Sequence, residues 1–262
     1  MAERVDDEGT RLAIPDRVRR VVSLVPSLTE AVAVTAPSLL VGVTDWCTHP
    51  DDLDDLGTRP LQRIGGTKNP DVDAIVELAP DVVLANQEEN KPGEIARLRD
   101  AGLTVYVTDV RTVEGAMVSL ERMLSACGLD RPAWLDGVRK AWGELPAPTA
   151  RRRAVVPVWR RPWMAVGSDT FTGAVLARLG VDNVLTDHEE RYPRVDPADL
   201  PDHDLVVLPD EPYRFTADDG PEAFDAPSVL VSGRLLTWYG PSLLDAALAL
   251  PAALAAPSGV SS

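Results

Sequence analysis

Short runs of apolar residues alternate along the chain with stretches in which apolar residues recur every three or four positions. The first pattern predicts buried β-strands and the second predicts amphipathic α-helices. In the first half of the chain we expect strands at 21–25, 40–44, 81–85 and 104–108, and helices at 27–35, 69–78, 94–101 and 113–127. Strands that alternate with helices favour a mostly parallel sheet covered on both faces, and hence an α/β fold.

The alternation is interrupted at residues 133–145, a predicted helix that no strand directly precedes. It is followed by the Pro-rich segment 146–150 and three arginines, a composition typical of a domain boundary. The pattern then restarts, with strands expected at 154–158, 163–166, 184–185, 204–208 and 229–231 and helices at 170–179 and 241–250. We therefore expect two α/β lobes joined by a single helix. The predicted parts are an N-terminal extension at 1–18, an N-terminal lobe at 19–129, a linker helix and Pro-rich connection at 130–150, a C-terminal lobe at 151–251 and a flexible tail at 252–262.

Some helix ends are marked by capping residues. Ser27 and Glu30 have the spacing of a capping box, in which each side chain bonds a backbone N–H of the first turn. In the second half, Asp169 or Thr170 is expected to cap a helix that ends at Gly180.

Composition narrows the function classes. At 262 residues with 45% hydrophobic residues, the chain is long enough to bury a substantial core. Its formal net charge is −15, which disfavours binding to nucleic acid phosphates and to anionic membrane surfaces. The two cysteines, Cys47 and Cys127, lie in separate segments, so we expect neither a disulfide framework nor a zinc site. The sequence contains no run of about 18 apolar residues, so it predicts no membrane span.

The start of the sequence bears on localisation. The first eight residues are polar and acidic, without the basic n-region, apolar h-region and cleavage site of a signal peptide, and without a lipobox cysteine. The sequence as given therefore predicts a cytoplasmic protein, and an extracytoplasmic one if a leader segment has been trimmed away.

Two aromatic clusters far apart in the sequence are the main indication of function. Trp46 lies in the segment 45–50, directly after the predicted strand 40–44. Trp238 and Tyr239 lie in the segment 237–241, which we expect to come directly after the predicted strand 229–231. Ligands of open α/β sheets lie beyond the carboxyl ends of the strands, so these rings predict two lobes that share one ligand. Such an arrangement indicates binding rather than catalysis.

Several strings, taken in order, carry a resemblance to a known family. They are RVVSLVPSLTE at 20–30, VGVTDWC at 41–47, GGTKNP at 65–70, LAPDVVLA at 78–85, YPRV at 192–195 and LPDEPY at 208–213. With these strings the chain resembles, over nearly its whole length, the helical-backbone (class III) solute-binding proteins of metal-chelate ABC importers. It looks most like their cobalamin-binding branch. The resemblance implies a bilobal receptor that clamps a corrinoid between its lobes, with a stiff connecting helix, no catalytic residues and no required cofactor.

The resemblance and the residue types together give a set of candidate ligand contacts. The resemblance places Trp46 where an aromatic residue faces the corrin; the alternative is a ring packed on its own lobe. Two glycines allow close approach of the backbone to a ligand, although a plain turn has the same composition. The candidates are Trp46, Cys47, His49, Gly65, Gly66 and Thr67 in the first lobe and Trp163, Tyr192, Glu211, Trp238 and Tyr239 in the second; Tyr213 shares the segment of Glu211 as a rim or turn residue.

Metal ligation and transporter docking are two further expectations. His49 and Cys47 carry donor groups that suit cobalt or iron, with His49 as the candidate axial ligand and a polar loop histidine as the alternative. In importer receptors an acidic residue on each lobe docks onto the permease. The resemblance places these docking positions at Asp73 and, around Ala198, at Asp196 and Asp199. Because these positions depart from the family pattern, a stand-alone cytoplasmic corrinoid binder is the other reading.

Three alternatives to a corrinoid binder remain open at this point. A heme or ferric-siderophore binder on the same scaffold would need cationic groups for an anionic chelate, and the candidates are Arg63, Lys68, Arg194, Arg214 and Arg234. An enzyme recruited from this scaffold would rely on His49 or on the carboxylate pairs Asp210 with Glu211 and Glu88 with Glu89. The third alternative is an interaction protein that keeps the fold and has lost its ligand.

Overall fold

The computed structural model describes residues 2–57 and 60–255. Within it the chain divides into two compact units, which differ in part from the predicted lobes. Among the described residues, unit 1 comprises 2–57, 60–110, 114–136 and 239–241, and unit 2 comprises 111–113, 137–238 and 242–255. The boundary thus falls inside the predicted linker helix, α6 (Ala133–Glu144), between Asp136 and Gly137.

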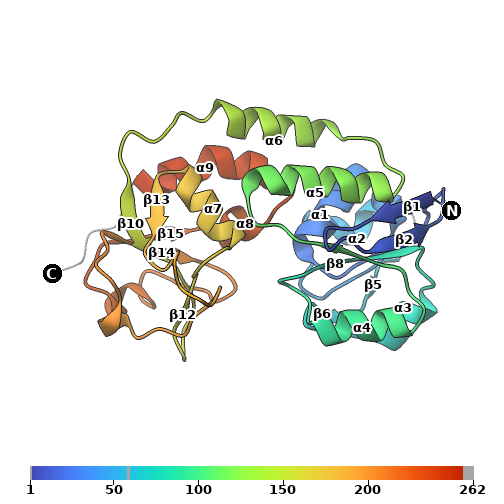
Figure 1. Ribbon diagram of the computed structural model, residues 1–262, viewed down its shortest axis with the longest axis horizontal. Helices are drawn as coiled ribbons and strands as arrows, with labels where there is room; N and C mark the ends of the chain where they lie inside the picture. The colour runs from blue at the N-terminus through green and yellow to red at the C-terminus, as the bar shows by residue number, and fades with distance from the viewer. Residues whose placement is uncertain (1, 58–59, 256–262) are drawn as a thin grey trace. The chain divides into compact units, whose positions relative to one another are not determined.

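Unit 1 is built on a five-stranded sheet in the order β5-β4-β3-β8-β9, with every pairing parallel. Its helices cover both faces, with α3 and α4 on the side opposite to α1 and α5 (Figure 1). The strands are β3 (Val21–Ser23), β4 (Leu40–Val43), β5 (Gln62–Arg63), β8 (Val82–Asn86) and β9 (Val105–Thr108). The helices are α1 (Pro26–Thr35), η1 (Pro37–Leu39), α2 (Leu53–Leu56), α3 (Val72–Glu77), α4 (Pro92–Asp100) and α5 (Val113–Ala126).

Four strands of the unit 1 sheet, β3, β4, β8 and β9, are buried along their whole length because helices cover both faces of the sheet, whereas the edge strand β5 is exposed. All five residues of β8 and all four of β9 are buried. Continuous apolar runs are the signature of a parallel sheet buried on both sides. The α/β fold class predicted from the sequence is confirmed.

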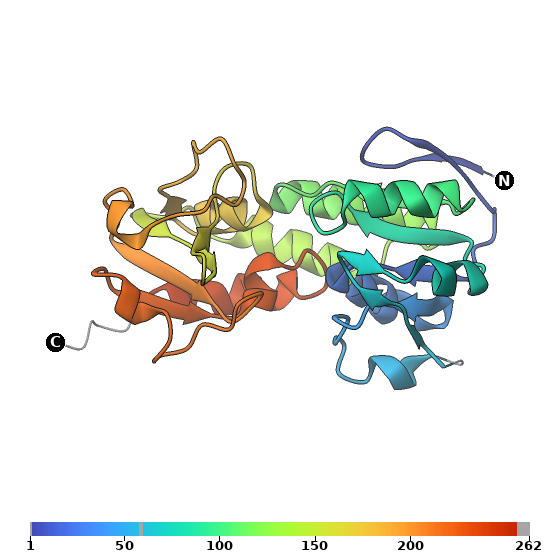
Figure 2. The same ribbon diagram turned by 90° about the horizontal axis from the view of Figure 1, so that it is seen from below.

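The first residues of the chain form a β-hairpin on unit 1 rather than a detached extension. Strands β1 (Ala2–Val5) and β2 (Arg11–Ile14) pair antiparallel, and Asp6 and Asp7 lie in the turn between them. The backbone N–H of Asp7 donates to Val107 of β9, and its carboxylate accepts from Ser119 of α5. Figure 2 shows the hairpin beside α5. The segment predicted as an N-terminal extension is thus packed onto unit 1.

Unit 2 contains a four-stranded parallel sheet in the order β13-β10-β14-β15. Its strands are β10 (Arg152–Val155), β13 (Val181–Asn183), β14 (Leu205–Pro209) and β15 (Ser228–Val231), with a separate pair β11 (Pro157–Trp159) and β12 (Met164–Ala165). Its helices are α7 (Phe171–Arg178), η2 (Pro197–Asp199), η3 (Pro221–Ala223), α8 (Gly233–Thr237) and α9 (Leu243–Ala255). One core cluster on this sheet consists of Val155, Ala165, Leu185, Val206, Leu208, Phe215 and Phe224.

Three local predictions are wrong. Helix α1 has Val25 as its N-cap with no side-chain cap, because Pro26 opens the helix and Ser27 is buried inside the first turn. The predicted flexible tail begins too early, since α9 runs to Ala255; residues 256–262 lie outside the described residues. Helix α8 intervenes between β15 and Trp238, so that the second aromatic cluster does not follow a strand directly. By contrast, Thr170 accepts from the N–H of Gly173 and caps α7, one of the two predicted choices.

Candidate functional site

The carboxyl edge of the unit 1 sheet gathers the segments that follow β3, β4, β5, β8 and β9. All these strands run parallel, so their carboxyl ends meet at one edge. Ligands of open α/β sheets bind beyond this edge. The first-lobe candidates from the sequence, residues 46–49 and 65–67, follow β4 and β5, and Glu88 and Glu89 follow β8.

Trp46 is the most exposed large apolar side chain of this edge, with 67% of its surface accessible. The backbone around it is held by Arg63, whose Nη1 donates to the carbonyls of Thr44 (3.0 Å) and Cys47 (2.7 Å). The same guanidinium donates to both carboxylate oxygens of Asp54 at 2.8 and 2.9 Å. The loop is therefore fixed while the indole faces outward, as a contact surface requires. Arg63 is engaged in this role and is not a cation available to an anionic chelate.

The Gly65–Gly66 pair lies next to this ring in a two-stranded turn. Strand β6 (Gly65–Gly66) pairs antiparallel with β7 (Asn69–Pro70). Gly65 has a φ of +80°, a conformation that favours glycine, and its carbonyl accepts from the N–H of Asp45 at 2.9 Å. A Cβ on Gly66 would lie 3.7 Å from Nε1 of Trp46. The two glycines thus form part of a turn and also leave the backbone beside the indole without side chains.

Two buried asparagines that the sequence analysis missed hold the next loop. The amide of Asn86 donates to the carbonyl and hydroxyl of Thr108 at 3.0 and 3.1 Å. Its Oδ1 accepts from the backbone N–H groups of Glu88 (2.9 Å) and Glu89 (3.2 Å). Asn90 completes the network, since its side chain accepts from Asn86 N and donates to the Thr67 carbonyl at 2.8 Å. The only signal in the sequence was a pair of asparagines four positions apart at a strand end.

This network presents two acidic side chains at the edge. Burial raises the pKa of the Glu89 carboxyl, the nearby Lys68 opposes this effect, and Glu88 adds to it. Lys68 Nζ lies 3.5 Å from the carbonyl oxygen of Glu88. The edge therefore combines the exposed indole of Trp46 with one lysine and two carboxylates. This combination suits a ligand with an apolar body and polar substituents.

Cys47 and His49, predicted as ligand contacts and metal donors, have different surroundings. The Cys47 thiol is fully buried, 3.0 Å from Thr29 Oγ1 and 3.2 Å from Thr44 Oγ1, and burial raises its pKa. The Cys47 side chain therefore points into unit 1, and a ligand contact at Cys47 stays a prediction. The His49 ring contacts Thr48 through Nδ1 (3.1 Å) and approaches Asp51 through Nε2 (3.6 Å). Among the residues that the structure describes, no group of three or more His, Cys, Asp or Glu side chains is arranged to hold a metal ion.

Tyr239, predicted to contact a ligand, is an internal anchor of unit 1. Residues 239–241 belong to unit 1 although the flanking chain belongs to unit 2. Only 6% of Tyr239 is accessible. Burial raises the pKa of its phenol, as do Glu89 and Glu88, while hydrogen bonds with Ser27 and Thr108 act in the opposite direction. The prediction placed Tyr239 in the second lobe, whereas the structure places it in unit 1, where its ring fills the carboxyl edge from within.

The unit 2 candidates differ in how far their rings are covered. Trp163 is half-buried, stacked on Phe215 with ring centres 5.9 Å apart and edge-to-face with Phe224 at 5.3 Å. The Arg160 guanidinium lies 5.1 Å from the same ring. These contacts favour a packing role for Trp163. Tyr213 also packs in this cluster, and its hydroxyl donates to Asp219 at 2.6 Å.

The remaining unit 2 candidates are half-buried. Arg234 lies 5.6 Å from the ring of Trp238, which directly follows α8. Glu211 packs against Gly233 so closely that a Cβ there would lie 2.3 Å from Cγ of Glu211. Tyr192 lies just before the bridge that joins Arg194 to Met164. The convergence of Trp238 with Trp46 on one ligand stays a prediction.

The predicted docking residues are exposed on short helices. Asp73 lies in the first turn of α3, and Asp199 lies in η2. Asp196 caps η2 by accepting from Ala198 N at 3.0 Å. In the part of the chain that the structure describes, no helix is long and apolar enough to cross a membrane.

Comparison with known proteins was made by family models, by sequence and by structure. No protein-family model matches the chain. The vitamin B12-binding protein of Vibrio cholerae is 25% identical over 190 residues, which cover 70% of this chain and 67% of that protein. An uncharacterised ABC transporter substrate-binding lipoprotein of Bacillus subtilis is 30% identical over 134 residues, covering 49% of this chain and 41% of the lipoprotein.

Solved structures share the whole fold. The periplasmic vitamin B12-binding protein of Vibrio cholerae superposes with a TM-score of 0.73 at 19% identity, over 91% of this chain and 97% of that one. A periplasmic heme-binding protein from Pseudomonas aeruginosa superposes with a TM-score of 0.69 at 23% identity, over 93% and 96% of the two chains. The resemblance drawn from the sequence is confirmed: the chain is similar in sequence to vitamin B12-binding proteins, and it shares its fold with periplasmic vitamin B12-binding and heme-binding proteins of known structure.

Proposed function

We propose that the chain binds a corrinoid, a cobalamin-like metal chelate, against the carboxyl edge of unit 1. The observation that carries this proposal is the exposed Trp46 ring, held by Arg63 beside Gly66 in a chain whose relatives include vitamin B12-binding proteins. A flat macrocycle would cover the indole and bring its peripheral amides to the polar groups of the adjacent loops. Binding would be non-enzymatic, with the corrinoid as cargo rather than as a cofactor.

Calorimetric titration with cyanocobalamin tests this proposal. Burying an exposed aromatic ring contributes about 1.5–3 kcal/mol, so Trp46→Ala is expected to weaken binding by about ten- to a hundredfold. Leu248→Ala is the matched control, because Leu248 is an exposed apolar residue (73% accessible) on α9 in unit 2. Absence of heat with the unchanged protein at high micromolar concentration would contradict the proposal.

A heme binder is the second candidate, since a heme-binding protein superposes on most of the chain. The heme reading predicts a Soret band that saturates at one equivalent of hemin and is lost in Trp46→Ala. A corrinoid binder is expected to bind cyanocobalamin more tightly than hemin. The reverse order of affinities would select the heme reading. Axial ligation by His49 would appear as a change in the visible spectrum of aquocobalamin on binding, abolished by His49→Ala.

An uptake experiment distinguishes the importer role from a stand-alone cytoplasmic role. The chain would be exported to the periplasm of cells that keep a cobalamin permease but lack their own binding protein. As an importer component it would restore uptake of labelled cyanocobalamin. Asp73→Ala combined with Asp196→Ala and Asp199→Ala would lower that uptake without changing the calorimetric Kd. Tight binding without any uptake would select the stand-alone binder.

A further inference from the structure

A cavity of about 550 Å³ lies in unit 1 at the amino edge of the sheet, the edge opposite to the candidate site. Its walls come from residues 16–19, which lead into β3, from residues 38–39, which lead into β4, and from residues 127–129, which follow α5. It shares no residue with the carboxyl edge. Its volume is within the range of about 300–1,000 Å³ typical of small-molecule sites.

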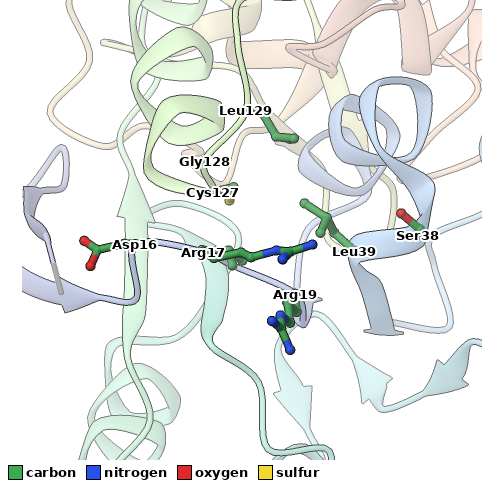
Figure 3. Close-up of a pocket in the computed structure, with 9 residues that line it drawn as sticks. Asp16, Arg17, Arg19, Ser38, Leu39, Cys127, Gly128 and Leu129 are labelled. Carbon is green, nitrogen blue, oxygen red and sulfur yellow. The ribbon is translucent and has the colours of Figure 1, made fainter.

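The charged residues that line this cavity are two arginines, Arg17 and Arg19, and one aspartate, Asp16. The part of the chain that the structure describes contains no ion-pair partner for the guanidinium group of Arg17 or of Arg19. Figure 3 shows the Arg17 side chain reaching toward Leu39, with Arg19 beside it, whereas the Asp16 carboxylate points away from both. Two exposed arginines that line one cavity without an ion-pair partner in the described chain are unexpected in a protein of net charge −15. An anion that contacted both guanidinium groups would compensate their charge.

The backbone that carries these arginines is fixed. The N–H groups of Arg19 and Arg20 donate to one carboxylate oxygen of Asp81 at 2.7 and 3.0 Å. The Arg20 guanidinium donates to the Leu78 carbonyl, so that this neighbouring arginine is engaged in structure. Val18 is buried and tethers the segment from the other side. Arg17 and Arg19 therefore start from defined positions, which lowers the entropy cost of placing them on a ligand.

The rest of the wall is largely apolar. Leu39 and Leu129 are half-buried, and Cys127 and Val18 are buried at the back. Ser38 adds one exposed hydroxyl. An apolar wall beside two guanidinium groups is complementary to an amphiphilic anion rather than to a bare inorganic ion.

The end of α5 does not supply the positive potential. The N–H groups of Cys127, Gly128 and Leu129 donate to carbonyls of the last turn of α5. The carbonyl end of a helix favours cations. Affinity for an anion must therefore come from the two guanidinium groups, which makes their removal a decisive test.

We propose that this cavity binds a small organic anion. Its carboxylate or phosphate group would lie between the guanidinium groups of Arg17 and Arg19, whose planar donor forks match either oxyanion. Its apolar body would lie against Leu39 and Leu129. The site goes beyond the corrinoid proposal and does not depend on it.

The test is a titration of the protein with four related compounds, followed by ¹H–¹⁵N NMR. 2-Naphthoate carries the carboxylate, 2-naphthyl phosphate carries the phosphate, 2-naphthamide is the neutral isostere, and inorganic phosphate lacks the apolar body. The variant is Arg17→Gln combined with Arg19→Gln. Arg153→Gln is the control, because Arg153 is an exposed arginine in unit 2 that bonds Asp204 through its backbone N–H and carbonyl. Thermal unfolding of each variant checks that the fold is retained.

We expect 2-naphthoate or 2-naphthyl phosphate to shift the amide signals of Ser38, Leu39, Gly128 and Leu129. The double variant is expected to weaken this binding at least tenfold and Arg153→Gln to leave it unchanged. 2-Naphthamide and inorganic phosphate should each bind at least tenfold more weakly than the naphthyl anion of higher affinity. Which of the two naphthyl anions binds more tightly shows whether the site prefers a carboxylate or a phosphate. Equal affinity for the amide, an unchanged Kd in the double variant, or shifts confined to Trp46 and Gly66 would each overturn the proposal. None of these outcomes depends on whether cyanocobalamin binds.

Discussion

Removal of the Asn86 side chain is the sharpest test of how the carboxyl edge is built. Asn86 is 2% accessible, and its amide makes four hydrogen bonds, two to Thr108 and two from the N–H groups of Glu88 and Glu89. At about 1 kcal/mol net for each bond, Asn86→Ala has an upper cost of about 4 kcal/mol. Because water can reach the N–H groups of an opened loop, we expect a loss of about 3 kcal/mol in the free energy of unfolding.

Urea unfolding measures this loss. With an m value of about 3 kcal/mol per M, the midpoint of unfolding is expected to fall by about 1 M. Hydrogen exchange should locate the effect, with the amides of Glu88 and Glu89 exchanging faster than in the unchanged protein. Asn69→Ala is the control, because Asn69 is exposed and its side chain accepts one hydrogen bond, from Lys91 Nζ, among the residues that the structure describes. A midpoint for Asn86→Ala within about 0.3 M of the unchanged protein, or an equal loss in Asn69→Ala, would refute the reasoning.

Three further changes test other contacts. Because burial raises the pKa of Glu89, the folded state binds that proton more tightly than the unfolded state, and stability is lost as pH rises above the ordinary value of 4.5. Glu89→Gln should therefore raise Tm at pH 7 but not at pH 4, and an equal gain at both pH values would contradict this. Gly167→Ala would place a Cβ 2.1 Å from the Glu190 carbonyl and should cost about 3 kcal/mol in urea unfolding, whereas Gly93→Ala, with open space around it, should cost nothing. Tyr239→Phe should cost about 1 kcal/mol and Tyr239→Ala about 3–5 kcal/mol, and a neutral Tyr239→Ala would show that the ring is not an anchor.

The parallel sheets could be predicted because their sequence signal is local. The apolar run predicted at 81–85 corresponds to β8 (Val82–Asn86), and the run predicted at 104–108 corresponds to β9 (Val105–Thr108). Strands buried on both faces must be apolar throughout, so the pattern does not depend on which neighbours they pair with. Family resemblance added the site's place in the chain, with Trp46 exposed at a strand's carboxyl end.

The orientation of individual side chains could not be predicted, because it depends on tertiary contacts. Trp46 and Cys47 are adjacent in one turn, yet the indole faces solvent and the thiol faces Thr29 and Thr44. A turn has no periodicity that assigns its residues to an inner and an outer side. The capping box at Ser27 failed for a similar reason, since the helix begins at Pro26 and Ser27 is buried. The place of Tyr239 in unit 1 depends on contacts across more than 130 residues of chain.

Most polar groups described at the carboxyl edge make hydrogen bonds that hold its loops in place. This explains why few of the predicted side chains at this edge are exposed to a ligand. Arg63 fixes the turn around Trp46, Asn86 fixes the loop of Glu88 and Glu89, and Tyr239 fills the sheet edge from within. An exposed indole has no hydrophobic reason to remain outside the core unless the surrounding backbone prevents its collapse. The network removes that alternative for Trp46. The edge is thus preorganised. Under the proposed function this would lower the entropy cost of binding, with the Trp46 ring as the main apolar contact for the corrinoid.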